Sequence, residues 1–166
     1  MHSRAPAWNG MLNAGRTDAA AKRFGQALDL VGKSSLSDDV KQDTRLADHY
    51  NKGRVALAKG DLATAKSEAK AYAEGATSRQ NKFRVRQAHE FEGRVALAEK
   101  KYDDAIMHLG QANQQDPEVI YLTAQAYEWK GESAKAKELA AKSANANVLP
   151  LVSYAFVRAK AKKMAA

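Results

Sequence analysis

The hexapeptide GRVALA occupies residues 53–58 and recurs unchanged at residues 93–98. The match extends to both sides, because HYNKGRVALAKGDLATA at 49–65 and HEFEGRVALAEKKYDDA at 89–105 are identical at eight of 17 positions. Such a duplication is either one chemical motif used twice or one structural unit built twice. The two alternatives predict different functions, so the residues of the hexapeptide have to be considered one by one.

The glycine of the hexapeptide favours a structural unit. Gly53 and Gly93 fall in the middle of predicted helices, where glycine costs about 1 kcal/mol relative to alanine. A close approach of the paired helix, at Ala65 or Ala105, would offset that cost. The apolar residues that follow each glycine would then pack on both sides of a helical layer.

The whole chain has the composition of an all-α protein. Ala, Lys, Glu, Gln and Leu are abundant, and no sustained alternation of apolar and polar residues indicates a strand. Helix-capping residues divide the chain, namely Thr17, Ser37, Asp61, Ser78 and Asp116 at starts and Gly15, Gly32, Gly60, Gly75 and Gly131 at ends. The predicted helices are 4–14, 17–31, 38–59, 62–74, 79–99, 102–114, 117–130, 133–144 and 150–163.

The pattern of small and large residues resembles the tetratricopeptide repeat (TPR) family. Residues 89–117 carry most of the family's pattern, with Gly93, Tyr102, Ala105, Leu109, Ala112 and Asp116-Pro117. The resemblance implies a right-handed superhelix of antiparallel helical hairpins, a TPR-like α-solenoid, in one domain over residues 1–166. Its units would span about 1–34, 37–76, 79–116 and 117–146, followed by a capping helix at 150–163.

The chain also departs from the family's pattern. The alanines that close the four copies, Ala20, Ala65, Ala105 and Ala136, are 45, 40 and 31 residues apart, whereas the family's period is about 34. We therefore expect longer first helices in the second and third units. For the capping helix we expect Val152, Ala155 and Phe156 to form the inward face.

The resemblance also implies a binding surface, because the residue after the mid-helix glycine faces the concave groove in that family. The groove residues carried over are Asn9, Asn13, Tyr50, Arg54, Glu90, Arg94, Tyr121, Gln125 and Glu128. Glu90 precedes Arg94 by four residues and can satisfy it as a helical ion pair, whereas Tyr50 precedes Arg54. The expected function is a noncatalytic scaffold that binds a peptide or protein segment, with Arg54 as the stronger ligand contact.

A net charge of +8 leaves a second function open. Arg79, Lys82 and Arg86 are spaced to share one face of the predicted helix 79–99. They form either a solvated face or a docking patch for an acidic partner or RNA phosphate. The alternatives to the scaffold are therefore a nucleic-acid-associated adaptor and an accessory domain of a larger multidomain protein.

The sequence predicts neither an enzyme nor a cofactor or metal site. The stretch HEFEG at 89–93 begins like a zinc-protease helix but has Gly93 in place of the second histidine. Repetition accounts for His49 and His89, and neither His2 nor His108 stands at a ligand spacing. The sequence ALDLVGKSS at 27–35 lacks the first glycine of a phosphate loop.

The sequence indicates the compartment and the assembly of the protein only in general terms. The chain has no cysteine and no apolar run of the roughly 18 residues that a membrane span needs. We expect a soluble protein, cytoplasmic by default and exported if an upstream signal is missing from this chain. Pro6 and an uncovered Trp8 predict self-association through residues 1–31 or a place in a longer repeat array, whereas the C-terminal helix is expected to end the array.

Overall fold

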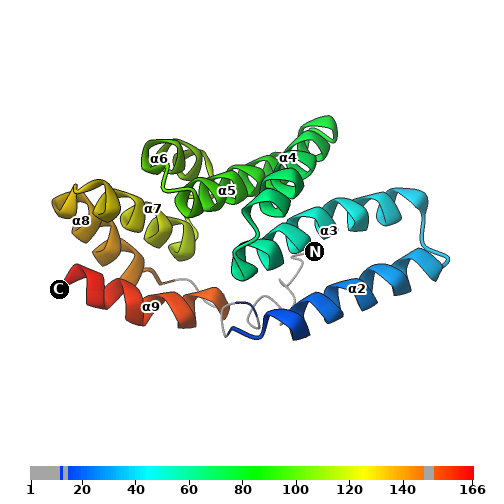
Figure 1. Ribbon diagram of the computed structural model, residues 1–166, viewed down its shortest axis with the longest axis horizontal. Coiled ribbons are helices and arrows are strands. Elements are labelled where there is room, and N and C mark those ends of the chain that lie inside the picture. The colour runs from blue at the N-terminus through cyan, green and yellow to red at the C-terminus, as the bar shows by residue number, and fades with distance from the viewer. Residues whose placement is uncertain (1–11, 13–14, 148–151) are drawn as a thin grey trace. The chain divides into compact units, whose positions relative to one another are not determined.

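Helices account for all the regular structure in the described part of the chain. The computed structural model describes residue 12, residues 15–147 and residues 152–166. Its helices are α2 (Thr17–Lys33), α3 (Asp38–Lys59), α4 (Leu62–Ser78), α5 (Lys82–Ala98), α6 (Tyr102–Gln111), α7 (Pro117–Lys130), α8 (Ser133–Ala144) and α9 (Val152–Ala165), as Figure 1 shows. The all-α prediction is confirmed for these residues, and the predicted helix 4–14 lies outside them except for residue 12. None of these helices combines the length and apolar character needed to cross a membrane.

The helix ends largely follow the predicted capping chemistry. The side chains of Ser37, Asp61 and Asp116 accept hydrogen bonds from backbone N–H groups in the first turns of α3, α4 and α7. Gly60 and Gly131 end α3 and α7 in the left-handed conformation, with φ of 77° and 93°. These five predictions are confirmed.

Two predicted N-caps, Thr17 and Ser78, are wrong. The N-cap of α2 is Arg16, which makes no side-chain capping bond, and Thr17 is already helical. Helix α4 runs through Ser78, and α5 begins after Asn81, whose side chain accepts from the N–H groups of Phe83 and Arg84. Asn81 is the stronger cap because its carbonyl oxygen satisfies two of the unpaired N–H groups at the helix start.

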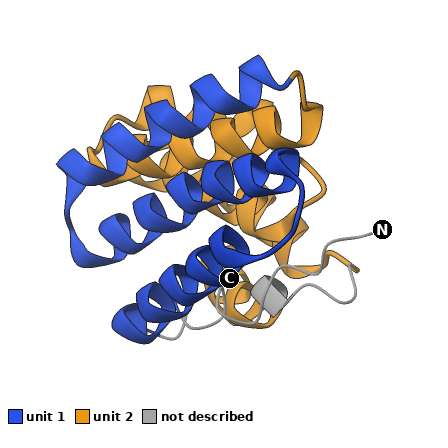
Figure 2. Ribbon diagram, turned by 90° about the vertical axis from the view of Figure 1, so that its right-hand side faces the viewer, with its two compact units in different colours: residues 1–79 blue, residues 80–166 orange. Residues whose placement is uncertain are grey.

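The chain divides into two compact units, residues 1–79 and residues 80–166 (Figure 2). In the first unit α3 packs against α2 and α4. In the second unit each helix from α5 to α9 packs against the next, and α7 also contacts α5 and α9. The division falls between the second and third predicted repeats, while the expected superhelix and single domain stay predictions.

The core of the first unit forms around one stripe of α3. Leu46, Tyr50 and Gly53 lie three and four residues apart and are buried together. The ring of Tyr50 lies against Tyr72 of α4, with 5.4 Å between centroids. Gly75, predicted to end a helix, instead lies inside α4, where an added Cβ would stand 2.5 Å from Leu46 Cδ1.

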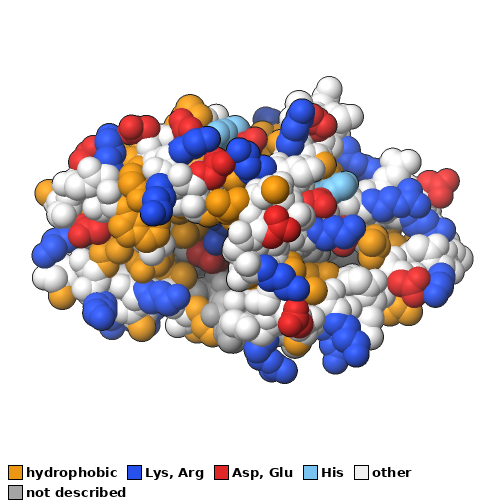
Figure 3. Space-filling model, viewed as in Figure 1, with side chains coloured by type: hydrophobic (Ala, Val, Ile, Leu, Met, Phe, Trp, Pro, Cys, Tyr) orange, Lys and Arg blue, Asp and Glu red, His pale blue; other side chains and the backbone are white. Residues whose placement is uncertain are grey.

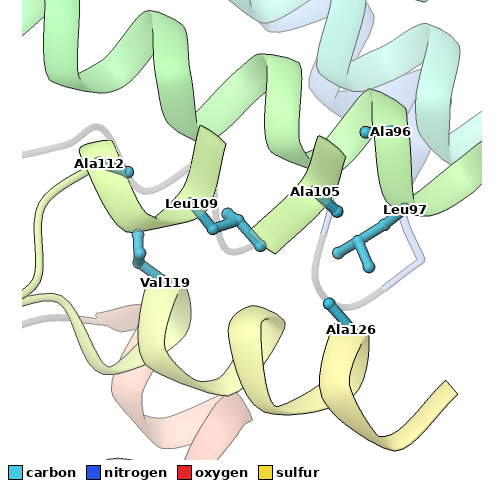
Figure 4. Close-up of a cluster of buried hydrophobic side chains, with 7 residues drawn as sticks. All are labelled: Ala96, Leu97, Ala105, Leu109, Ala112, Val119 and Ala126. Carbon is cyan, nitrogen blue, oxygen red and sulfur yellow. The ribbon is translucent and has the colours of Figure 1, made fainter. Parts of the chain in front are cut away.

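The core of the second unit depends on a close approach of α5 and α6. A Cβ built on Gly93 would stand 2.6 Å from Leu109 Cγ and 3.3 Å from the Leu109 nitrogen. The predicted close approach of the paired helix at Gly93 is therefore confirmed, but the neighbour is Leu109 and not the predicted Ala105. Figure 4 shows the adjoining apolar cluster of Ala96, Leu97, Ala105, Leu109, Ala112, Val119 and Ala126.

The lengths of the first helices follow the unequal repeat spacing. Helix α3 has 22 residues, α5 has 17 and α7 has 14. Helix α9 packs on α8 and α7, but two of the three residues predicted for its inward face are wrong, and the side chain of the third, Val152, lies outside the described part of the structure. Val157 and Ala161 are buried, whereas Ala155 and Phe156 are exposed. Both buried residues lie one turn apart, so the inward stripe is shifted relative to the predicted one.

Candidate functional site

Arg94 is held by two carboxylates of the second unit. Its Nη2 lies 2.8 Å from Glu90 Oε1 and 3.0 Å from Glu118 Oε1, and its Nε donates to Glu90 Oε1 at 2.9 Å. All three side chains are 13–14% exposed. The expected pairing of Glu90 with Arg94 is confirmed, and α7 supplies a second acid. The cation is therefore neutralised within the fold and is poorly placed to contact a ligand.

The same ion-pair cluster lies beside a carboxyl group with a perturbed pKa. Burial raises the pKa of Asp116 to about 6, and the negative charges of Glu90 and Glu118 add to this shift. The N–H of Glu118, which donates to Asp116 Oδ1 at 2.8 Å, and the charge of Arg94 oppose the shift. Asp116 thus caps α7, and its ionised carboxylate costs the folded state more free energy than its protonated form does.

Arg54, the counterpart of Arg94 in the first unit, has a different environment. Its guanidinium carbon lies 5.7 Å from the centroid of the Tyr50 ring. Among the described residues, no carboxylate forms an ion pair with Arg54. Tyr50 is itself 6% exposed, so its ring is a buried support for the Arg54 guanidinium. The expectation that Tyr50 lines an open groove is wrong, because Tyr50 belongs to the buried stripe of α3.

The remaining predicted groove residues of the second unit differ in their exposure. Tyr121 packs against Ala144, Val157 and Ala161, and burial raises its pKa. Gln125 is half-buried and Glu128 is exposed at the end of α7. Asn9 and Asn13 lie outside the described residues. Arg54 on α3, which forms no ion pair among the described residues, is therefore the clearest of the predicted ligand contacts.

The three residues of the predicted basic patch do not lie on one helix. Arg79 ends α4 in the first unit, where its Nη1 lies 3.0 Å from Asp39 Oδ1 and 3.7 Å from Asp43 Oδ1. Lys82 and Arg86 are exposed on α5. The prediction placed all three residues on one helix. Gln80, with φ of 50°, instead interrupts the helical backbone between Arg79 and Lys82. On the face in Figure 3, acidic side chains are scattered among the basic ones.

A cluster of three metal-ligating side chains lies on the α5–α6 hairpin. His89 Nδ1 is 3.3 Å from His108 Nδ1 and 3.4 Å from Glu92 Oε2, and His108 Nδ1 is 3.3 Å from Glu92 Oε2. The side chains are 25–30% exposed. The expectation that His108 has no partner is wrong, because the hairpin brings it opposite His89.

The repeat itself contains a signal for this cluster. In the first unit His49 Nδ1 lies 2.6 Å from Glu68 Oε2. Adding 40 to both residue numbers gives His89 and His108. The contact of His49 with Glu68 in the first hairpin thus predicts the contact of His89 with His108 in the second. The two residues of each pair are 19 positions apart in the sequence. Lys52, which pairs with Asp48 at 2.7 Å, stands where the second unit has Glu92.

Comparison of the chain with protein-family models, with curated proteins and with solved structures gave no match.

Proposed function

We propose that the chain is a noncatalytic helical scaffold that binds a peptide or protein segment, and that Arg54 contacts an anionic group of that segment. The proposal builds on the hairpins of the two units and on the resemblance to tetratricopeptide repeats. The single observation that carries it is the contrast between two equivalent arginines. Arg94 is neutralised by two acids, whereas Arg54 has an aromatic ring beneath it.

The cation–π contact with Tyr50 positions Arg54 for recognition. A guanidinium that rests on an aromatic ring keeps its N–H groups directed outward along its edges. Those donors match the two oxygens of a carboxylate, which can bind both at once. The ring is fixed in turn by Tyr72, so little side-chain entropy remains to be lost when a ligand binds.

The experiment is a selection from a random peptide library displayed on phage, with the full chain immobilised as bait. The same library is then counter-selected on Arg54→Gln. We expect enriched peptides that share an acidic residue and that are depleted by the counter-selection. Enrichment of peptides without a common acidic position, or no enrichment above an empty support, contradicts the proposal.

The matched control is Arg45→Gln. Arg45 is an exposed residue of the same helix, nine positions before Arg54 and thus about half a turn out of phase with it. This substitution removes the same charge from the opposite side of α3. We expect Arg45→Gln to retain the selected peptides. Equal loss in both variants would show that net charge alone governs the binding, and would overturn the role given to Arg54.

A further inference from the structure

We propose that His89, Glu92 and His108 form a Zn²⁺ site with three protein ligands on the α5–α6 hairpin. Two neutral imidazoles and a carboxylate are an established ligand set for zinc. Their three candidate ligand atoms, two Nδ1 and one Oε2, all lie within 4.8 Å of one another. Donors of this kind also favour zinc over the hard cations Mg²⁺ and Ca²⁺, which take oxygen ligands.

The distances among the ligand atoms fit a tetrahedral ion. Bonds of about 2.0–2.1 Å to a tetrahedral centre place neighbouring ligand atoms about 3.3–3.4 Å apart. The three measured separations are 3.3, 3.4 and 3.3 Å. The triangle of donors therefore already has the size of one tetrahedral face. Zn²⁺ can bind at that face without a change of backbone.

The two helices hold this triangle in place. His89 and Glu92 are three residues apart on α5 and thus share one side of the helix. His108 comes from α6, next to Leu109, and Glu92 is next to Gly93. The contact between Gly93 and Leu109 allows the helices to approach closely, and that approach brings the third ligand to the other two. The glycine of the repeated hexapeptide thus supports the site directly.

The exposure of the site leaves room for a fourth ligand. Each of the three side chains is about a quarter to a third exposed. Zinc sites with three protein ligands complete their tetrahedron with water. A water molecule from solvent can reach this position in the same way. The bound ion would join α5 to α6 and stabilise the hairpin by mass action.

The first unit provides an internal comparison. Its equivalent residues are His49, Lys52 and Glu68, with the lysine at the position of Glu92. The pairing with Asp48 raises the pKa of Lys52, which keeps its amine protonated and unable to bind a metal. We therefore expect one zinc ion per chain.

The test is isothermal titration calorimetry of the full chain with ZnCl₂, using protein without a polyhistidine tag and freed of metal by a chelator. We expect one equivalent to bind with a micromolar or lower Kd. His108→Ala should weaken binding at least about 100-fold, because loss of a ligand exceeds the 10–100-fold effect of outer contacts. Glu92→Lys copies the first unit and should weaken it similarly.

His49→Gln and His2→Ala are the control variants, and both should bind zinc as the wild type does. Circular dichroism of each variant checks that the helices are retained. A rise in Tm with ZnCl₂ in the wild type, absent in Glu92→Lys, gives a second readout. Binding only at millimolar zinc, or one equivalent that survives in His108→Ala and Glu92→Lys but is lost in a control variant, would overturn the assignment.

Discussion

The guanidinium of Arg54 lies over the ring of Tyr50, with 5.7 Å between the Arg54 Cζ and the ring centroid. Forty residues later the repeat places Glu90 and Arg94 in these two positions, and there the same spacing produces an ion pair at 2.8 Å. One residue before the arginine, the glycine is buried in both copies. The exchange of Tyr50 for Glu90 therefore changes the environment of the arginine without changing the hairpin.

Replacing each arginine by glutamine should have unequal effects on stability. Arg94→Gln leaves Glu90 and Glu118 without their cation, and we expect the free energy of unfolding to fall by about 3 kcal/mol, the cost of losing one partner of a largely buried pair. Arg54→Gln loses a contact with an aromatic ring worth about 0.5–1 kcal/mol. Urea denaturation followed by circular dichroism measures both. Equal losses would contradict the difference in their environments.

Gly93→Ala should destabilise the second unit. The added Cβ would stand 2.6 Å from Leu109 Cγ and 3.3 Å from a backbone nitrogen, so α5 and α6 must separate. Overpacking of this kind costs about 1–3 kcal/mol. Trp129 fluorescence during urea denaturation, in a Trp8→Phe background, reports the unfolding of this unit.

Gly110→Ala is the control within the same unit. A Cβ on Gly110 meets nothing within 4 Å, and alanine is the better helix former by about 0.5–1 kcal/mol. We expect this variant to be as stable as the wild type or slightly more so. A Gly93→Ala protein of undiminished stability would show that the close approach at Leu109 is not required.

Asp116→Asn should stabilise the second unit at neutral pH. The asparagine oxygen can still cap α7, but it carries no charge. The folded pKa of Asp116 is about 6 against an ordinary value of 3.8, so the native state binds the proton more tightly than the unfolded state. The stabilisation from protonation is complete below about pH 3.8 and is lost as the pH rises through 6.

The pH dependence of the difference between Asp116→Asn and the wild type is therefore the measurement. At pH 8 we expect the variant to be more stable by about 1–3 kcal/mol. Near pH 4 the advantage should have largely disappeared, because the wild-type carboxyl is then mostly protonated in the folded protein. An advantage that stays constant from pH 4 to pH 8 would contradict the raised pKa.

The sequence predicts those features that depend on neighbours along one helix. Helix positions, the caps Ser37 and Asp61 and the pair of Glu90 with Arg94 follow from spacings of a few residues. The mid-helix glycine also predicts a close helix, because its cost needs an offset. The resemblance to tetratricopeptide repeats was a less reliable guide, since it placed Tyr50 in a groove. The spacing of four residues between Leu46 and Tyr50 already puts Tyr50 in the buried stripe of α3.

Features that join different helices were harder to predict. His108 meets His89 only because α5 turns back into α6, and the separation of 19 residues carries no periodic signal. The pairing of Arg79 with Asp39 spans 40 residues and two helices. Both depend on how hairpins close, which local propensity does not determine. The repeat relates His49 and Glu68 to His89 and His108, and it is the sequence feature that connects these two contacts.

The claim that Arg54 recognises an acidic group is tested most directly by the affinity of one selected peptide. Fluorescence anisotropy gives its Kd for the wild type, for Arg54→Lys and for Arg45→Lys at one salt concentration. Both substitutions retain the charge, but only Arg54→Lys removes a planar guanidinium from the Tyr50 ring. The account predicts binding weakened about tenfold or more by Arg54→Lys and unchanged by Arg45→Lys. Equal Kd values for all three proteins would contradict it.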